Sequence, residues 1–149
     1  MLIVFDIDGT LANIEHRISF VRSKPKNWKA FDAGIPNDKV NPHVAAAFFA
    51  LRDAGHEILF ASGRSEDTRA STQKWLEDNG FWEPWSHLYM RKSGDYRGDD
   101  IVKREILEQI VRGFNRKPDM VFDDRPRVVR MWREEGIFVF NVYQGEEDF

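Results

Sequence analysis

The chain has 149 residues, a formal net charge of -3 and no cysteine. This length suits one domain with one core, and the lack of cysteine excludes disulfides and thiolate metal sites. Because the net charge is small, any contact with nucleic acid would have to be local. No apolar run approaches the roughly 20 residues of a membrane span, and the short apolar start lacks the basic lead of a signal peptide. We therefore expect a cytoplasmic protein with no membrane partner.

Strand and helix patterns alternate along the chain. Short apolar runs predict buried strands at residues 2–6, 57–62, 87–91, 119–124 and 137–142. Apolar residues at helical spacing, with caps and glycine stops at their ends, predict the helices between them. These helices are expected from Asn41 to Gly55, from Ser65 to Gly80, from Asp99 or Asp100 to Gly113, and from Pro126 onward.

This alternation predicts an α/β fold, in which helices cover both faces of a parallel sheet. Such sheets bind ligands beyond the carboxyl ends of their strands. Polar residues follow three of the predicted strands at that position. They are Asp6 and Asp8 after the first strand, Ser62, Gly63 and Arg64 after the second, and Asp123 and Asp124 after the fourth.

The first strand ends in two acids separated by one residue. With 25 acidic residues in the chain, about four such pairs are expected by chance, and this pair could simply end a strand and cap a turn. The following Gly9 and Thr10 favour a functional loop. Glycine permits a sharp turn that brings backbone N–H groups near an anion, and threonine adds a hydroxyl.

The stretch "DIDGTLA" resembles the first motif, DxDGT, of the haloacid dehalogenase-like phosphatase superfamily. Ser62 matches the second motif, Lys103 the third, and the pair Asp123-Asp124 the fourth, in the expected order. The resemblance covers nearly the whole chain. It implies a three-layer Rossmann-like sheet of five strands in the order 5-4-1-2-3, with strands one, two and four side by side.

The resemblance also implies a role for each catalytic residue. Asp6 would attack phosphorus and form an aspartyl-phosphate, and Asp8 would act as general acid and then general base. Ser62 and the backbone near it would hold phosphoryl oxygens. Lys103 would neutralise negative charge, and Asp123 would orient Lys103 or a metal-bound water. Taken singly, the serine could be a turn residue and the lysine part of a solvated helix face, but their joint occurrence in order favours the site.

The expected cofactor is Mg²⁺, which suits a site made only of oxygen ligands. By resemblance, its protein ligands would be the side chains of Asp6 and Asp124 and the backbone carbonyl of Asp8.

A narrower resemblance comes from "FDDRPRVVRMWREEGIFVFNV" and "RKSGDYRGDDIVKREIL", which are similar to the phosphatase domain of bacteriophage-type polynucleotide kinase-phosphatase. That domain removes 3′-phosphates from nucleic-acid ends. Arg17, Arg64 and Asp99 match residues of that domain. Two arginines suit a dianionic phosphate, and Asp99 would orient one of them. The substrate-binding residues expected are Thr10, Arg17, Gly63, Arg64 and Asp99.

The gaps between the motifs predict an open site. We expect a single domain over residues 1–149 with a small insertion at about 12–40, which is too short for an independent cap. An open site admits the end of a polymer. Basic residues crowd this insertion and the loop after the third strand. They could form a basic rim that attracts a nucleic-acid backbone or part of a mixed solvated surface, and composition favours neither. These residues are Arg17, Arg22, Lys24, Lys26 and Lys29, and Arg91, Lys92 and Arg97.

The predicted function is Mg²⁺-dependent hydrolysis of terminal 3′-phosphomonoesters of nucleic acid through an aspartyl-phosphate. The alternative is a phosphatase of free nucleotides or of another small phosphomonoester. A non-catalytic domain that binds phosphorylated ends would be expected to lack Asp6 or Asp8, and both are present. No GxxxxGK[ST] stretch occurs, so we expect no kinase domain in this chain. The sequence carries no indication of oligomeric state.

Overall fold

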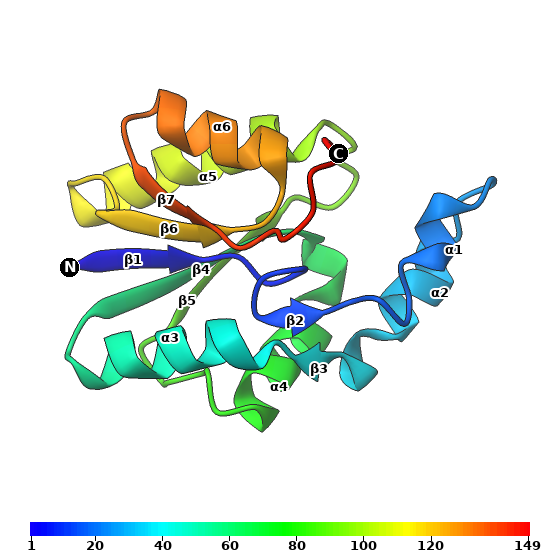
Figure 1. The fold of residues 1–149 in the computed structure, drawn as a ribbon, viewed down its shortest axis with the longest axis horizontal. Coiled ribbons are helices and arrows are strands. Elements are labelled where there is room, and N and C mark those ends of the chain that lie inside the picture. The colour runs from blue at the N-terminus through cyan, green and yellow to red at the C-terminus, as the bar shows by residue number, and fades with distance from the viewer.

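The computed structural model describes residues 1–149 and has a parallel sheet of five strands at its centre (Figure 1). The strands are β1 (Leu2–Phe5), β4 (Glu57–Ser65), β5 (His87–Arg91), β6 (Met120–Asp123) and β7 (Phe138–Asn141). Their spatial order is β5-β4-β1-β6-β7. Numbered one to five in chain order, the same strands read 5-4-1-2-3 from β7 to β5, so the predicted fold class is confirmed. The labels differ because two short strands, β2 (Ala12–Asn13) and β3 (Lys39–Val40), lie outside this sheet.

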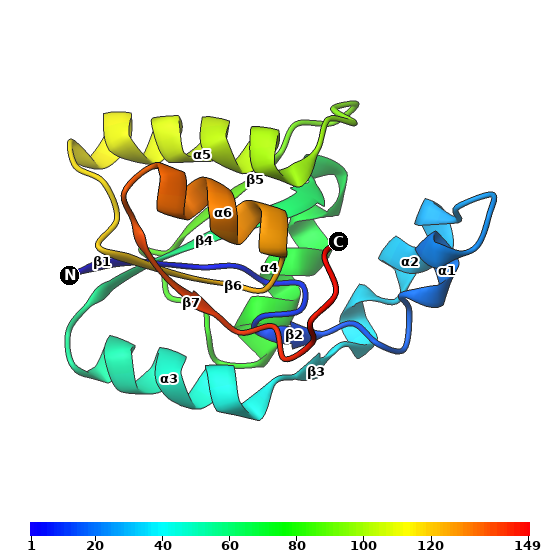
Figure 2. The same ribbon diagram turned by 45° about the horizontal axis from the view of Figure 1, so that its top comes forward.

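Helices cover both faces of the sheet (Figure 2). One face carries α3 (Pro42–Asp53) and α4 (Arg69–Asp78), and the other carries α5 (Asp99–Phe114) and α6 (Pro126–Glu134). The predicted start at Ser65 is wrong for α4. The Ser65 hydroxyl instead accepts a bond from the Asp67 N–H and caps a short 3-10 helix, η2 (Glu66–Thr68), which leads into α4. None of the helices combines the length and the apolar character needed to cross a membrane.

Strand β1 is central because its side chains alternate between two hydrophobic clusters. Ile3 and Phe5 pack with α3 and α4, whereas Leu2 and Val4 pack with α5 and α6. All four side chains are fully buried. This two-sided burial explains why the strand is apolar throughout instead of alternating with polar residues.

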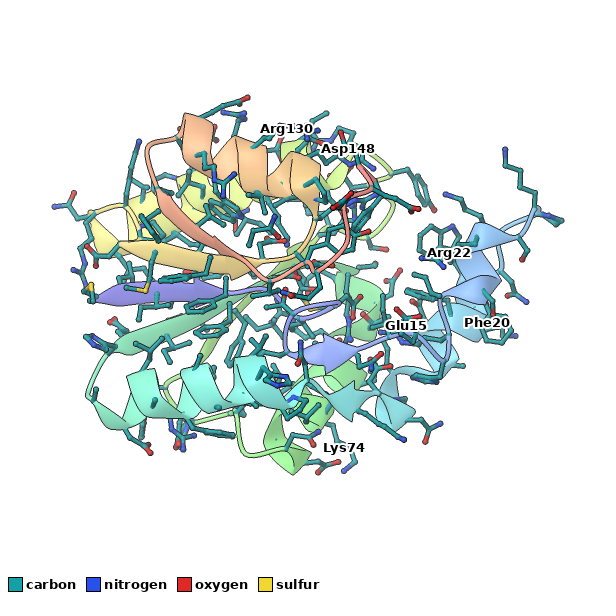
Figure 3. The ribbon with its side chains drawn as sticks, in the orientation of Figure 1. Glu15, Phe20, Arg22, Lys74, Arg130 and Asp148 are labelled. Atoms are coloured by element: carbon teal, nitrogen blue, oxygen red, sulfur yellow. The ribbon has the colours of Figure 1, made fainter.

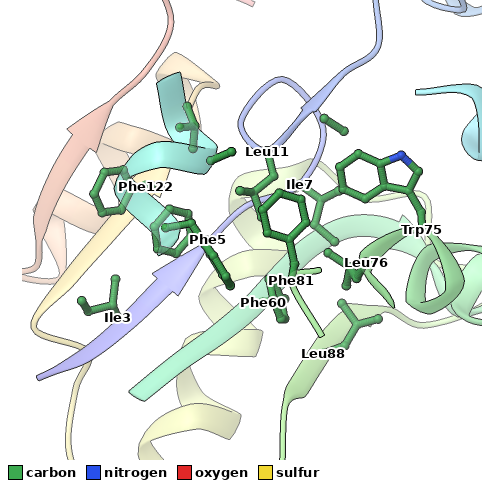
Figure 4. Packing of buried hydrophobic residues seen from close by; sticks show 14 of the residues in the cluster. Ile3, Phe5, Ile7, Leu11, Phe60, Trp75, Leu76, Phe81, Leu88 and Phe122 are labelled. Atoms are coloured by element: carbon green, nitrogen blue, oxygen red, sulfur yellow. The ribbon is translucent and has the colours of Figure 1, made fainter. Parts of the chain in front are cut away.

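Aromatic side chains pack beneath the carboxyl end of β1 (Figure 4). The Phe5 ring stacks on Phe122 with centroids 4.4 Å apart and meets Phe48 edge-on at 5.1 Å. Phe48 in turn contacts Phe60 and Phe81. Since strand β1 leads directly into Asp6, this packing fixes the direction in which the first acid leaves the sheet.

The predicted insertion contains secondary structure that the sequence patterns did not reveal. Strand β2 (Ala12–Asn13) pairs with β3 (Lys39–Val40) in antiparallel register. The residues between them, which we call the helical insertion (residues 14–38), contain three short helices. These are α1 (Ser19–Arg22), α2 (Trp28–Ala33) and the 3-10 helix η1 (Ile35–Asn37). The helical insertion projects beyond the carboxyl ends of the sheet strands (Figure 1).

Truncating Phe48 tests the importance of the aromatic cluster for stability. Phe48 is 1% exposed, so Phe48→Ala should lower the free energy of unfolding by about 3–5 kcal/mol. Urea denaturation followed by circular dichroism measures this change. The matched control is Phe138→Ala, because Phe138 is 65% exposed on β7 and its loss should cost less than about 1 kcal/mol. Equal losses of unfolding free energy in the two variants would contradict the proposed contribution of the aromatic cluster to stability.

Candidate active site

Three neighbouring strands bring the predicted acids together. Phe5 at the end of β1 aligns with Phe60 on β4 and with Phe122 on β6. The residues that follow these positions therefore lie at one level, and the Asp6 N–H donates to the Phe122 carbonyl at 3.0 Å. The sheet register thus brings the acids that follow separate strands in the sequence together at one edge of the sheet.

Lys103 connects two of these acids. Its Nζ donates to Asp6 Oδ1 and to Asp123 Oδ2, both at 2.7 Å. Burial favours the neutral amine, but the two carboxylates outweigh it and hold the pKa of Lys103 above its usual range. Lys103 is therefore a fixed positive charge and not part of a solvated helix face.

Asp123 is saturated by hydrogen bonds from the protein. Its Oδ1 accepts the N–H groups of Asp124 and Arg125, while its Oδ2 accepts Lys103 and the indole N–H of Trp132. Four donors fill the acceptor positions of one carboxylate. Asp123 therefore has little capacity left for a metal ion and is placed to hold Lys103.

Asp6 and Asp124 have the opposite character. Together with Asp123 they offer carboxylate oxygens that all lie within 4.8 Å of one another. Burial, followed by repulsion between neighbouring carboxylates, raises the pKa of Asp124, and burial likewise raises the pKa of Asp6 although Lys103 works against it. The hydrogen-bond partner of the Asp124 carboxyl group is the neighbouring Asp6 carboxyl group, and this contact also raises the pKa of Asp124. This excess of buried negative charge, made only of oxygen ligands, fits a hard divalent cation such as Mg²⁺.

The loop after β1 is closed tightly around this acidic group. The Gly9 N–H donates to the Ala12 carbonyl at 2.9 Å, so it is not free for an anion. Gly9 has φ +78°, and a Cβ there would lie 2.1 Å from Asp124 Oδ2. Glycine is therefore required here for backbone conformation and for space. The Asp8 carbonyl accepts none of the loop's backbone bonds, which leaves it available to a ligand.

Asp8 belongs to a second charged cluster, beside the first. Its Oδ1 accepts Arg17 Nη2 at 2.9 Å and Arg64 Nε at 3.0 Å. Burial works to raise the pKa of Asp8, but Arg64 and then Arg17 outweigh it, so the pKa lies below its usual value. The two guanidiniums are almost fully buried, and each makes four hydrogen bonds to the protein. Since a guanidinium has five N–H donors, only one on each arginine remains for a substrate.

Asp38 completes the second cluster, and sequence reasoning missed it. Its side chain is fully buried and accepts Arg17 Nε at 2.7 Å and Arg64 Nη2 at 3.1 Å. His16 Nε2 lies 2.7 Å from the same carboxylate. Asp38 follows η1 in "PNDKV", a stretch without a motif. One signal could have indicated it: Arg17 and Arg64 were both expected in the site beside Asp8 alone, and two buried arginines need more than one acid.

The remaining predicted residues line the same edge of the sheet. The Thr10 hydroxyl donates to Asp6 Oδ2 at 2.9 Å, so it orients an acid in this structure. The buried Ser62 hydroxyl accepts the Arg64 N–H at 3.1 Å and donates to no protein acceptor. Gly63 lies against Asp99, whose Oδ1 would be 2.8 Å from a Cβ at that position.

One predicted contact is wrong. Asp99 does not orient Arg17 or Arg64 but bonds Arg91 and Arg125. Arg125 follows Asp124 directly, and Arg91 also donates to the Gly63 carbonyl. Although burial opposes it, these positive charges hold the pKa of Asp99 below its usual range. Asp99 therefore ties the end of β5 to the loop after β6. Arg91 is thus engaged by protein groups, and Arg97 pairs with Asp95 and Glu105.

Comparison with known proteins agrees with this geometry. Residues 1–149 match the family model of the polynucleotide kinase PNKP phosphatase domain. A protein of Autographa californica nuclear polyhedrosis virus, described as a bifunctional polynucleotide kinase/RNA ligase, is 31% identical over an alignment of 150 positions, which covers 99% of this chain and 20% of the viral protein. The matched part is thus about a fifth of that relative.

Solved structures show the same fold. A chain of the Pnkp1/Rnl/Hen1 RNA repair complex superposes with a TM-score of 0.78 and 29% identity, covering 97% of this chain and 43% of that chain. A haloacid dehalogenase-like hydrolase from Streptococcus pneumoniae superposes with a TM-score of 0.67 and 16% identity, covering 99% of this chain and 86% of the other. The predicted resemblance is confirmed: the chain belongs to the family of polynucleotide kinase phosphatase domains, within the haloacid dehalogenase-like fold, and is a phosphoric monoester hydrolase.

Proposed function

We propose that residues 1–149 act as a single Mg²⁺-dependent phosphatase domain that removes terminal 3′-phosphates from nucleic acid through an aspartyl-phosphate. The observation that carries this proposal is the pair of acids after β1. One, Asp6, is held by Lys103, and the other, Asp8, is held by two arginines. The two carboxylates have different partners, and their places in the DxDGT motif assign them two different roles in one reaction.

Asp6 is the proposed nucleophile. Lys103 holds its Oδ1 and Thr10 holds its Oδ2, so the carboxylate has one fixed orientation. Attack on phosphorus forms the Asp6–phosphate bond and breaks the bond to the 3′ oxygen of the sugar. Water then attacks the same phosphorus, which releases inorganic phosphate and restores the carboxylate. Lys103 stays positive throughout and reduces the repulsion between the nucleophile and the phosphate.

Asp8 is the proposed proton carrier. It lies two residues after the nucleophile, and its side chain is 25% exposed, so a leaving oxygen and a water molecule can reach it. In the first step a protonated Asp8 would give its proton to the 3′ oxygen, and in the second it would take one back from the attacking water. Arg17 and Arg64 favour the ionised carboxylate when no substrate is bound, so in this proposal the approach of the phosphate dianion, which pairs with the same positive charges, raises the pKa of Asp8 and allows it to carry the proton. Most N–H groups of Arg17 and Arg64 donate to Asp8 and Asp38. We therefore propose that the main role of the two arginines is to hold Asp8 in place. Their single remaining N–H groups and the Ser62 hydroxyl are the proposed contacts to phosphoryl oxygens.

The proposed Mg²⁺ ligands are the side chains of Asp6 and Asp124 and the carbonyl of Asp8. When bound, the ion would neutralise charge between the nucleophile and the phosphate. The saturated carboxylate of Asp123 supports its assignment to positioning Lys103 instead.

The substrate proposal rests on two supports. The matched family and the names of the relatives refer to polynucleotides, and the short insertion leaves the carboxyl edge of the sheet without a separate cap domain. An open edge suits the end of a polymer better than a small molecule that needs to be enclosed. The choice of the 3′ end rests on the motifs shared with the bacteriophage-type domain.

Comparing two substrates tests the proposed function. We expect kcat/KM for a 3′-phosphorylated oligonucleotide to exceed that for a 3′-mononucleotide, because the open edge can contact further nucleotides. Phosphate release in the presence of Mg²⁺ measures both rates. Asp6→Asn should lower both by about 10³-fold or more, since it removes the nucleophile. Faster turnover of the mononucleotide would overturn the polymer proposal, and full activity of Asp6→Asn would overturn the proposed mechanism.

Metal binding can be tested without activity. Mg²⁺ should raise the melting temperature, and at 100 times its Kd it should add about 2.7 kcal/mol to the free energy of unfolding. Asp124→Asn should abolish this rise and leave the metal-free protein at least as stable, because the substitution removes one of several repelling buried carboxylates. Differential scanning calorimetry with Mg²⁺ or a chelator measures both effects. Asp78→Asn, on the exposed end of α4, should keep the full response; a response retained by Asp124→Asn would exclude it as a ligand.

Asp38 should matter for both stability and catalysis. Asp38→Ala leaves two buried guanidiniums with one acid fewer, which should cost about 3–5 kcal/mol of unfolding free energy. Asp38→Asn keeps the shape of the side chain and should fold better, while misplaced arginines lower kcat by about 10²-fold with a smaller change in KM. Asp53→Ala, which removes an exposed partner of Arg52, is the control and should change neither quantity. A folded Asp38→Asn variant with full activity would refute this role.

A further inference from the structure

The helical insertion carries unpaired positive charge. Arg22, Lys24, Lys26 and Lys29 lie within eight consecutive residues that contain no acid. None of these four side chains forms an ion pair. By contrast, Arg91 at the end of β5 and Arg97 in the loop that follows are bonded to acids of the protein. In a chain with a net charge of -3, this unneutralised cluster beside the site is a local attraction for phosphates.

The same insertion exposes two aromatic side chains. Trp28 is 53% exposed and Phe20 is 40% exposed. Lys26 Nζ lies 5.6 Å from the centre of the Trp28 ring. An exposed aromatic ring next to a cation is the combination that binds single-stranded nucleic acid, because bases stack on the ring while the cation meets the backbone. Phe20 and Arg22 are labelled on this part of the chain in Figure 3.

A series of contacts connects Trp28 to the active site. The Trp28 ring meets Phe31 edge-on at 5.7 Å, and the Arg17 guanidinium lies 4.2 Å from the centre of the Phe31 ring. Arg17 in turn bonds Asp8. The position of Trp28 relative to the reacting atoms is therefore set by packed side chains and not by a free loop.

We propose that the helical insertion binds the nucleotides that precede the 3′-terminal phosphate. A base of the single strand stacks on Trp28, and Arg22, Lys24 and Lys26 contact backbone phosphates. This proposal rests on the proposed function and deepens it, because it names the residues that distinguish a polynucleotide end from a mononucleotide. The other strongly exposed tryptophan, Trp85, is 72% exposed but precedes β5, at the amino end of the sheet, away from the site.

The double variant Lys26→Ala/Trp28→Ala tests the proposal. The substrates are a 3′-phosphorylated oligonucleotide of about ten nucleotides and a 3′-mononucleotide. The ratio of kcat/KM on the oligonucleotide to that on the mononucleotide should fall about 10- to 100-fold, mainly through KM, because one stacked base is lost. Trp28→Phe keeps an aromatic surface and should restore most of the ratio. The matched control Lys74→Ala/Trp85→Ala, which changes a lysine and a tryptophan away from the site, should keep the ratio.

Salt dependence gives a second readout that a purely structural role would not change. For the wild type, log(kcat/KM) on the oligonucleotide should fall linearly with log[salt] under conditions where binding limits the rate. Arg22→Ala/Lys24→Ala should flatten this slope by about 0.7 for each lost phosphate contact. The slope on the mononucleotide serves as the reference.

Each outcome has one meaning. If the wild type prefers the oligonucleotide and Lys26→Ala/Trp28→Ala keeps that preference, the insertion does not bind the strand. The proposal is also overturned if the double variant loses activity equally on both substrates, since Trp28 would then act only by positioning Arg17. If the wild type itself shows no preference for the oligonucleotide, the proposed substrate class fails first, independently of the variants.

Discussion

The structure depends on the cost of burying several carboxylates at one point. Asp6, Asp123 and Asp124 bring their oxygens within 4.8 Å of one another, and in a poorly hydrated site such an arrangement is stable only next to positive charge. The protein supplies one fixed cation, Lys103, from α5. The packing of α5 on the sheet therefore determines whether the acids can stay together, and the negative charge that Lys103 leaves uncompensated suits a divalent cation.

In the second cluster, which contains Asp8 and Asp38, the buried carboxylates are neutralised by arginines of the protein. Asp8 and Asp38 face Arg17 and Arg64, so two negative and two positive side chains balance without an added ion. The two clusters meet at the loop after β1, which carries Asp6 in one and Asp8 in the other. This division gives the two acids of one short motif opposite shifts in pKa, one upward and one downward. The helical insertion closes the second cluster and carries Trp28 and its neighbouring cations, so it connects the chemistry to the proposed strand-binding surface.

Sequence patterns predicted the sheet and its main helices because those elements bury apolar residues at regular spacing. They also predicted that Asp6, Asp8, Lys103 and the Asp123-Asp124 pair lie at one edge of the sheet, since strand ends and motif order locate them. Asp38 escaped detection because its position depends on where short helices without periodicity rejoin the sheet. The predicted partners of Asp99 were wrong for a related reason: its actual partners lie at the end of β5 and in the loop after β6, 8 and 26 residues away, and no local spacing connects them.

The indole of Trp132 joins two parts of the molecule that are usually considered separately. It is fully buried among the apolar side chains of α5, α6 and the sheet, yet its N–H reaches Asp123 at 3.1 Å. A change in the packing around Trp132 would therefore also affect Asp123, because the two side chains share this hydrogen bond. A substitution of Trp132 would therefore remove core packing and a hydrogen bond to Asp123 at the same time.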